Sequence, residues 1–335
     1  MKKFVLFGFL ALVVGMFLCQ SCSDESEPTF PLSALIFNSV SDKQVAFTAL
    51  THSAVSWSWD FGDGQTSTEK DPVHVYDEGG YYLATLTAMD KEGNTVTAEA
   101  NLAIALTPYA LLTGDYTQPG YDGKTWKLSQ AHSVNDKVVN SDLDLTLFDE
   151  DIQYLPAGAF DLYLGLKEAY NDEYTFYYDG SFKHNTTDGS SFAGLVYAYI
   201  MQQYGQTTIT KTGGKAVFGA DAFALTTYTP ADDATFKLVE NENFSVPTIP
   251  KFATGVNSSG IPVVTYPGVM TLDFPNSTEF IGVMDFQRKV IVQNITNNSM
   301  RLVMFLCMST DAIVSLNPLT ALNTNALILT FEVVD

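Results

Sequence analysis

The amino-acid sequence predicts an all-β protein with two β-sandwich domains. Its 335 residues exceed the usual size of one domain, so two domains are expected. Aromatic residues, mostly 17 tyrosines and 23 phenylalanines, make up 13% of the chain, and such residues are enriched in strands. Short runs of alternating apolar and polar residues, separated by glycine, proline and aspartate, recur along most of the sequence. This alternation is typical of half-buried strands.

The charge balance limits the class of partner. The chain has 17 basic and 38 acidic residues, which gives a net charge of −21 at pH 7. Phosphate backbones and anionic lipid surfaces repel such a chain, so nucleic acid is excluded as a partner. Hydrophobic residues make up 46% of the sequence, which is enough to form a buried core and excludes a disordered chain.

The first residues predict export and a lipid anchor. Lys2 and Lys3 precede an apolar run over residues 4–18, which has the length of a secretory signal and is short for a membrane span. A cysteine follows a small residue after this run, as in the signals of bacterial lipoproteins. We therefore expect residues 1–21 to be a lipoprotein signal peptide and Cys22 to be the lipidated first residue of the mature chain.

The cysteines predict neither a disulfide nor a redox site in the mature chain. Cys19 and Cys22 have the spacing of a redox motif, but Cys19 lies in the apolar signal segment and would be removed with it. Cys307 lies in an apolar run over residues 302–308 and is expected to be a buried thiol.

Residues 22–31 predict a solvated tether that follows the anchor. The stretch Ser23-Asp24-Glu25-Ser26-Glu27-Pro28 is acidic and polar and cannot pack into a core. It resembles the acidic export signal that follows the lipidated cysteine in surface lipoproteins of Bacteroidota. The resemblance implies a protein that is lipid-anchored in the outer membrane and faces the cell exterior. The alternative is that this stretch is a spacer and carries no export signal.

Residues 32–106 predict a small antiparallel sandwich. Four segments place apolar residues on alternate positions: Val45 and Phe47; Val55, Trp57 and Trp59; Tyr82, Ala84, Leu86 and Ala88; and the alternate residues from Val96 to Ile104. Two segments, residues 60–64 and 90–94, combine aspartate with glycine and are expected to be turns. The size and strand count are those of an immunoglobulin-like sandwich.

The motif in this domain resembles the PKD domain. It consists of Trp59-Asp60-Phe61-Gly62-Asp63-Gly64, followed by Pro72, His74 and Tyr76 and then by Gly80, Tyr82 and Leu86. PKD domains are immunoglobulin-like sandwiches that mostly act as spacers, so the resemblance implies that Trp59 and His74 pack internally. Asp60 and Asp63 are expected to accept hydrogen bonds within their own turn. Calcium ligation by the two aspartates and a catalytic role for His74 are the alternatives.

Residues 107–123 lack a sustained periodicity and predict a junction, after which residues 124–335 form a second domain. The strands expected there are residues 125–128, 173–178, 181–183, 216–218, 222–225, 235–239, 269–272, 289–295, 299–305 and 326–331. So many strands imply two packed sheets of jelly-roll or related type. Residues 191–204 differ, because their apolar residues recur at helical spacing, and a short helix is expected.

Two motifs in the second domain resemble a family of glycan-binding lipoproteins. They are Gly123-Lys124-Thr125-Trp126-Lys127-Leu128, and Asn171-Asp172-Glu173-Tyr174-Thr175-Phe176 closed by a turn at Asp179-Gly180. They are similar to the carbohydrate-binding-module-like half of PKD-containing surface glycan-binding lipoproteins, which accompany the SusC/SusD-type uptake pair in polysaccharide utilisation. The resemblance implies a jelly-roll-like, carbohydrate-binding-module-like sandwich that captures a polysaccharide or oligosaccharide for such a transporter, without catalysis. Trp126 lies within its strand motif and is expected in the core.

The sequence predicts no catalytic residue, no metal and no cofactor. Three pairs of acidic residues are adjacent in the chain, at residues 150–151, 172–173 and 232–233. Adjacent side chains point to opposite faces of a strand, so these pairs do not suit a pair of catalytic carboxylates. The four histidines are scattered, whereas zinc sites need clustered ligands. Asp142 and Asp144, with residues 149–151 nearby, leave a structural calcium site as an alternative.

Aromatic residues in loops are expected to form the glycan site, because sugar rings pack their C–H faces on aromatic planes. The candidates are Tyr154, Phe160, Tyr163, Tyr197, Tyr199 and Tyr204. A neutral glycan is expected, since an acidic one would meet the net negative charge and find only Arg288 and Arg301 for bidentate recognition. The range of the family suggests a β-glucan such as laminarin. A surface glycoside hydrolase or lyase with an unrecognised site and a protein-binding adhesin are the alternative functions.

Overall fold

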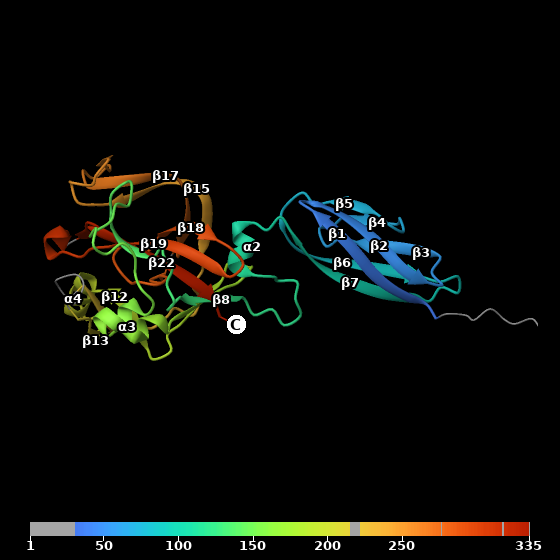
Figure 1. Cartoon of the computed structure of the whole chain (residues 1–335), viewed down its shortest axis with the longest axis horizontal. Coiled ribbons are helices and arrows are strands. Elements are labelled where there is room, and N and C mark those ends of the chain that lie inside the picture. Colours follow the sequence, from blue (N-terminus) through green and yellow to red (C-terminus); the bar gives the residue numbers. More distant parts are fainter. Residues whose placement is uncertain (1–30, 215–221, 276, 317, 335) are drawn as a thin grey trace, which may run out of the picture. The chain divides into compact units, whose positions relative to one another are not determined.

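The computed structural model describes residues 31–334, except residues 215–221, 276 and 317 (Figure 1). The expected signal peptide, the lipidation site at Cys22 and nearly all of the tether lie outside the described residues, as does the strand expected at 216–218. The chain divides into two compact units. One contains the described residues up to Glu78 together with Tyr82–Ile104, and the other contains Gly79–Tyr81 and the residues from Ala105 onward. Strands dominate both units, which confirms the predicted all-β class.

The first unit is a sandwich of two sheets, ordered β1-β2-β5 and β4-β3-β6-β7. Its strands are β1 (Ser33–Ser41), β2 (Gln44–His52), β3 (Ser56–Asp60), β4 (Thr66–Ser67), β5 (Val73–Val75), β6 (Gly80–Met89) and β7 (Thr95–Ile104). Alternate residues of the strands are buried between the sheets, and Phe47, Trp59 and Leu86 are at most 2% exposed. The alternation in the sequence therefore identified the buried faces of β2, β3, β6 and β7.

The turn over residues 60–64 is held by its own side chains. Oδ1 of Asp60 accepts a hydrogen bond from the backbone N–H of Gly62, and Oδ2 of Asp63 lies 2.7 Å from Nε2 of the buried His74. His74 also stacks on Phe61, with ring centroids 4.1 Å apart. Gly62 has a φ of +80°, and a Cβ there would lie 2.6 Å from a backbone carbonyl oxygen, so only glycine fits. The internal roles expected for Asp60, Asp63 and His74 are confirmed.

The second unit contains a ten-stranded sheet and a smaller three-stranded sheet. The larger sheet is ordered β11-β10-β8-β22-β19-β18-β17-β15, with β9 also paired to β22 and β16 to β17; the smaller is ordered β12-β14-β13, and β20 pairs with β21. The strands are β8 (Lys124–Leu128), β9 (Lys137–Asn140), β10 (Glu173–Phe176), β11 (Phe182–Asn185), β12 (Ser190–Gly194), β13 (Ile209–Thr212), β14 (Phe223–Thr227), β15 (Lys237–Pro247), β16 (Gly255–Val256), β17 (Pro262–Asp273), β18 (Val290–Ile295), β19 (Ser299–Leu306), β20 (Ile313–Leu316), β21 (Leu319–Ala321) and β22 (Asn325–Val333). The helices are α2 (Pro108–Thr113), α3 (Ala159–Leu164) and α4 (Leu195–Gln203), with 3-10 turns η1 (Lys167–Tyr170) and η2 (Thr310–Ala312).

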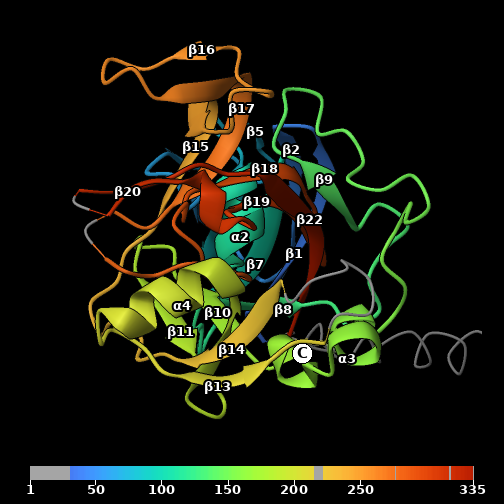
Figure 2. The ribbon, with the colours of Figure 1, turned by 90° about the vertical axis from the view of Figure 1, so that its left-hand side faces the viewer.

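The last strand of the chain lies in the middle of the large sheet. β22 pairs along one side with β19. On its other side, its first half pairs with β9 and its end pairs with β8 (Figure 2). All of these pairs are antiparallel. β8 and β22, the first and last strands of this sheet in the sequence, are therefore neighbours. The centre of the sheet forms only when the two ends of the unit's sequence meet.

One face of the large sheet is buried, and the opposite face is buried in part. One face packs against the three-stranded sheet across a cluster that includes Trp126, Phe192 and Phe223, each at most 1% exposed. The opposite face carries a second cluster, in which Phe305 of β19 contacts Tyr266 of β17 with ring centroids 5.4 Å apart. The two packed sheets expected from the strand count are confirmed, and Trp126 lies in the core as expected.

The helix expected over residues 191–204 is partly wrong. α4 begins at Leu195, whereas Ser190–Gly194 form strand β12, which pairs with β14. Phe192 fits a helical stripe in the sequence, but β14 supplies the hydrogen bonds of a strand and Phe192 is buried. At Gly194 a Cβ would collide with Oδ2 of the buried Asp285, so a larger residue at the junction of strand and helix would have to displace this carboxylate.

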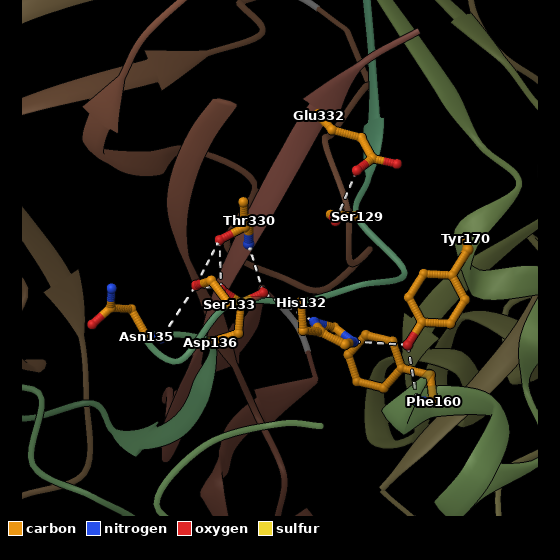
Figure 3. A network of polar contacts seen from close by, with 9 residues as sticks. All are labelled: Ser129, His132, Ser133, Asn135, Asp136, Phe160, Tyr170, Thr330 and Glu332. Carbon is orange, nitrogen blue, oxygen red and sulfur yellow. Dashed lines mark hydrogen bonds and ion pairs between the residues drawn. The ribbon is translucent and has the colours of Figure 1, made fainter. Parts of the chain in front are cut away.

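Asp136 occupies a gap beside β22, between the residues that pair with β9 and those that pair with β8 (Figure 3). There the backbone N–H of Thr330 donates to Oδ2 of Asp136 at 2.9 Å, in place of a strand carbonyl. The hydroxyls of Ser133 and Thr330 donate to Oδ1, and Nδ1 of His132 lies 2.9 Å from Oδ2. Burial by itself would raise the pKa of Asp136, but these hydrogen bonds outweigh it and the pKa is lowered.

The same network reaches α3. Nε2 of His132 lies 2.8 Å from the hydroxyl of Tyr170, which accepts a hydrogen bond from the backbone N–H of Phe160 (Figure 3). The ring of His132 therefore bridges the carboxylate of Asp136 and the hydroxyl of Tyr170. The ring of Phe160 meets that of His132 edge to face, with centroids 5.4 Å apart. The network therefore fixes α3 relative to β22.

We expect Asp136→Ala to lower the free energy of unfolding of the second unit by about 3–5 kcal/mol at pH 7, because it leaves several buried donors without an acceptor. The pKa of Asp136 is lowered in the folded state, so its stabilisation is complete above the unfolded-state pKa and is lost as the pH falls through the folded-state pKa. The difference between wild type and variant should therefore shrink below about pH 4. Urea unfolding at pH 7 and pH 3 measures both values.

Asp144→Asn is the matched control, because Asp144 is an exposed acid in the same unit. It should change the free energy of unfolding by less than about 0.5 kcal/mol. A destabilisation by Asp136→Ala that grows towards acid pH would contradict the role given to the carboxylate.

Candidate functional site

A groove of about 710 Å³ lies between α3 and the loop that precedes it. It is lined by Asp149, Glu150, Asp151, Ile152, Gln153, Tyr154, Pro156 and Tyr163. Its volume falls within the range of small-molecule sites, roughly 300–1,000 Å³. Two aromatic side chains, three carboxylates and one amide therefore line one hollow of the surface.

Local hydrogen bonds position this loop. Oδ1 of Asp149 accepts from the backbone N–H of Asp151, which forms a turn stabilised by its own side chain. The backbone N–H of Leu155 donates to the carbonyl of Asp136 at 2.6 Å, so the loop is anchored on the network beside β22. Gly158, with a φ of +68°, precedes α3, and its backbone N–H donates to the carbonyl of Gln130. These two contacts attach the C-terminal end of the loop to segments that adjoin the large sheet.

The structure brings together two of the six aromatic residues predicted for the glycan site. Tyr154 is 55% exposed and Tyr163 is half-buried, and both line the groove. Phe160 lies one helical turn before Tyr163, is 1% exposed and packs in the core. Its place in a loop segment suggested an available ring, but Tyr170 and His132 hold it inside the unit.

The other three predicted aromatics lie in or directly after α4, and none of them lines this groove. Tyr197 is 7% exposed, and its hydroxyl accepts a hydrogen bond from Nη2 of Arg288 at 2.8 Å. Tyr199 is 48% exposed. Tyr204 is 52% exposed, and its hydroxyl donates to the carbonyl of Leu316. Sequence spacing alone placed these rings in one segment but could not tell which faces were free.

The acidic residues of the groove were not predicted as part of the site. From the sequence, residues 149–151 enter only the alternative of a structural calcium site with Asp142 and Asp144. In the structure, Asp142 is engaged by Thr146, which donates to it from both its backbone N–H and its hydroxyl. Within the described part of the chain, no group of three or more aspartate, glutamate, histidine or cysteine side chains is placed to hold a metal. The signal that could have identified the acids is their position just before Tyr154.

A second cluster of titratable groups is enclosed in the interior. Nδ1 of His184 lies 3.1 Å from Oε2 of Glu279, and Nε2 lies 3.2 Å from Oδ2 of Asp172. Burial by itself would lower the pKa of His184, but the two carboxylates outweigh it and raise the pKa. With a carboxylate at each nitrogen, the ring donates from both and is protonated. The side chain of His184 is fully buried, so this cluster has a structural role and offers no base to a substrate.

The comparisons with known proteins identify the first unit. Residues 38–104 match the family of the PKD domain, which confirms the domain expected there. Collagenase ColQ1 of Bacillus cereus (strain Q1) is 46% identical over 50 residues, and the match spans 15% of this chain but only 5% of the collagenase. The crystal structure of the PKD1 domain of Vibrio anguillarum Epp is 28% identical and aligns to 24% of this chain and 99% of its own, with a TM-score of 0.23.

One solved structure aligns to most of the chain. It is a structure of carbohydrate-binding modules from the β-sandwich super family, which are described as having promiscuous specificity. The alignment covers 92% of this chain and 93% of that chain. The identity is 13% and the TM-score is 0.24, so the function proposed below does not depend on it. No helix among the residues that the structure describes is long and apolar enough to cross a membrane.

The His184 cluster makes the stability of the second unit depend on pH. The pKa of His184 is raised in the folded state, so its stabilisation is complete below the ordinary histidine pKa of about 6.5 and is lost as the pH rises through the folded-state pKa. We expect the wild-type free energy of unfolding to fall as the pH rises above about 6.5. His184→Asn should be less stable than the wild type at pH 6 and should lose this dependence. Urea unfolding across this range measures both effects.

His52→Asn, which removes an exposed histidine from the first unit, is the control and should keep the wild-type dependence. If His184→Asn shows the same decline in stability above pH 6.5 as the wild type, the assignment of the proton to His184 is wrong.

Proposed function

We propose that this protein is a non-catalytic, lipid-anchored surface protein that binds a neutral polysaccharide in the groove of Tyr154 and Tyr163. A single observation carries the proposal: two partly exposed aromatic side chains share this groove with three carboxylates and an amide. We further propose a β-glucan such as laminarin as the ligand and a SusC/SusD-type transporter as the recipient of the captured chain. The comparisons do not extend to these last two points, which come from the sequence resemblance.

The composition of the groove suits a sugar chain. The faces of a pyranose ring carry C–H groups that pack on aromatic planes, and Tyr154 supplies a ring that is more than half exposed. Sugar hydroxyls are hydrogen-bond donors and acceptors, and the carboxylates of Asp149 and Asp151 accept while the amide of Gln153 does both. Tyr163 is partly embedded in the core cluster, so its ring is held in place before a ligand arrives.

The charge of the groove favours a neutral ligand. Asp149, Glu150 and Asp151 line it, and none of its lining residues is basic. A polyanion would meet repulsion from these carboxylates and from the net charge of −21 of the whole chain. Hydroxyl groups, in contrast, donate well to ionised carboxylates.

The location is also proposed, from the sequence. Lipidation at Cys22 and the acidic tether over residues 22–31 would hold the two units outside the outer membrane. The PKD domain, at residues 38–104, would then act as a spacer between the anchor and the binding unit. Its aromatic residues Trp59 and Tyr76 are buried, which leaves them unavailable for a ligand.

Protein binding is a second candidate function, favoured by the outer face of the β1-β2-β5 sheet. Five large apolar side chains on these strands are more than half exposed: Leu35, Phe37, Leu50, Val73 and Val75. Leu35 lies opposite Leu50 in the pairing of β1 with β2, so these two belong to one face. Contiguous exposed apolar side chains mark sites of protein interaction. The partner in this case would present a complementary apolar surface.

Tyr154→Ala should weaken binding of laminarin roughly thirtyfold, since truncation of a central aromatic contact typically costs about 2 kcal/mol. Tyr163→Ala should weaken it by a similar factor with a modest loss of stability, because part of its ring is packed in the core. Tyr199→Ala is the matched control, as it removes an exposed tyrosine outside the groove and should leave the affinity unchanged. Isothermal titration with the purified chain from residue 23 onward gives the dissociation constants.

The same preparation is tested by native gel retardation with a panel of neutral and acidic polysaccharides, together with an assay for new reducing ends. Trp126→Ala serves as a folding control, since truncation of this buried ring should cost about 3–5 kcal/mol of stability. Release of product would identify an enzyme, and retention of proteins without any polysaccharide would favour the second candidate function. Loss of binding in Tyr199→Ala but not in Tyr154→Ala would place the site on α4.

The location is tested in cells. Cys22→Ala should leave the protein in the periplasm or unprocessed, because the lipid would have no attachment site. Replacement of Asp24, Glu25 and Glu27 by asparagine and glutamine should keep the lipid but remove accessibility to protease on intact cells. Unchanged protease accessibility in the second variant would rule out the tether as a surface signal and leave it as a spacer.

A further inference from the structure

A second, smaller pocket lies beside α4 and β14 and shares no residue with the groove of Tyr154 and Tyr163. Its volume is about 290 Å³. It is lined by Tyr197, Gln206, Thr207, Thr227, Tyr228, Thr229, Thr278, Met284 and Arg288. Hydroxyls and an amide surround a single charged group, the guanidinium of Arg288. The charged group of this pocket is therefore positive, whereas those of the groove are negative.

Arg288 is held rigidly in this pocket. Nη2 donates to the hydroxyl of Tyr197 at 2.8 Å, and Nη1 donates to the carbonyl oxygen of Thr278. The guanidinium also lies over the ring of Tyr197, with its central carbon 5.7 Å from the ring centroid. A guanidinium has five N–H groups in a planar fork, and these two contacts use two of them. Arg288 is half-buried, so a ligand would find the remaining donors already oriented.

The charge of Arg288 is not neutralised by a carboxylate. The ion pairs among the described residues involve lysine and histidine, and none includes an arginine. Neither Glu279 nor Asp285, the acids of this region, forms an ion pair with Arg288. Glu279 contacts His184 and accepts the backbone N–H of Ala231. Oδ1 of Asp285 accepts the backbone N–H groups of its neighbour in sequence and of Cys307.

The protonation of Asp285 further reduces the negative charge near Arg288. Burial raises the pKa of Asp285 to about 7, against a smaller lowering by its backbone hydrogen bonds and by Arg288. Near neutral pH this carboxyl group is therefore protonated in a large fraction of molecules and offsets little of the positive charge. Arg288 is therefore a half-buried arginine without an ion-pair partner among the described residues, in a chain with a net charge of −21.

We propose that the Arg288 pocket binds the carboxylate group of a small polar ligand, either a sugar acid or a simple carboxylic acid. The planar fork of a guanidinium matches the two oxygens of a carboxylate. The hydroxyls of Thr207, Thr227 and Thr229 and the amide of Gln206 lie around it and suit a ligand that also carries hydroxyl groups. This inference goes beyond the proposed function, because the acidic groove excludes the same carboxylate that this pocket attracts.

The proposal is tested by ligand titration of the full mature chain, followed by NMR or calorimetry, with four separate probes: glucuronate, glucose, acetate and inorganic sulfate. Arg288→Gln is the decisive variant, because glutamine can still donate to Thr278 or Tyr197 but lacks the charge and the planar fork. Arg301→Gln, which changes the only other arginine of the sequence, is the matched control for loss of one positive charge. Thermal unfolding of both variants reports whether each is folded.

We expect glucuronate to bind at least ten times more tightly than glucose, Arg288→Gln to remove this preference, and Arg301→Gln to preserve it. Binding of acetate with similar strength would support the proposal and identify a general carboxylate site, whereas glucuronate without acetate would support it and identify a sugar acid. Equal binding of glucose and glucuronate, stronger binding of sulfate than of glucuronate, or binding of none of the four would overturn it. If Arg288→Gln is unfolded, addition of glucuronate must still raise the unfolding temperature of the wild type above that seen with glucose, or the proposal fails.

Discussion

The hydrogen bond from the backbone of Thr330 to the buried carboxylate of Asp136 is the interaction on which the second unit depends. β22 lies in the middle of the large sheet, but its neighbour on one side changes from β9 to β8, and at the change a backbone donor would be left unpaired. An unpaired buried N–H is costly, so a side chain has to replace the missing strand. Asp136 does so, and through His132 and Tyr170 the same carboxylate also holds α3 in place.

Buried charge in this unit joins segments that the sheets do not connect. The His184 cluster links β11 to the loop that carries Glu279, and Asp285 accepts backbone donors near β19. Each cluster lies in the interior, where a paired or protonated group is stable and a lone charge is not. Titratable residues are therefore a poor guide to function in this protein, because the most strongly buried ones stabilise connections between loops.

Two surface sites of opposite charge follow from the same framework. The loop before α3 presents aromatic rings beside carboxylates, whereas the pocket beside α4 presents one oriented guanidinium among hydroxyls. A neutral sugar suits the first site and a carboxylate suits the second. The two proposed specificities therefore differ in charge, within a chain whose overall charge is strongly negative.

The sequence by itself determined the all-β class, the PKD domain with its turn-capping aspartates, most strands of the second unit and the burial of Trp126, because alternation and turn residues are local signals. The tertiary structure decided the rest. Phe192 became part of a strand because β14 lies beside it, and Phe160 became a core residue because Tyr170 and His132 hold it. The same holds for the hydroxyls around Arg288, which come from separate segments. Such sites depend on pairings between residues far apart in the chain, and no local pattern encodes which distant partner a side chain will meet.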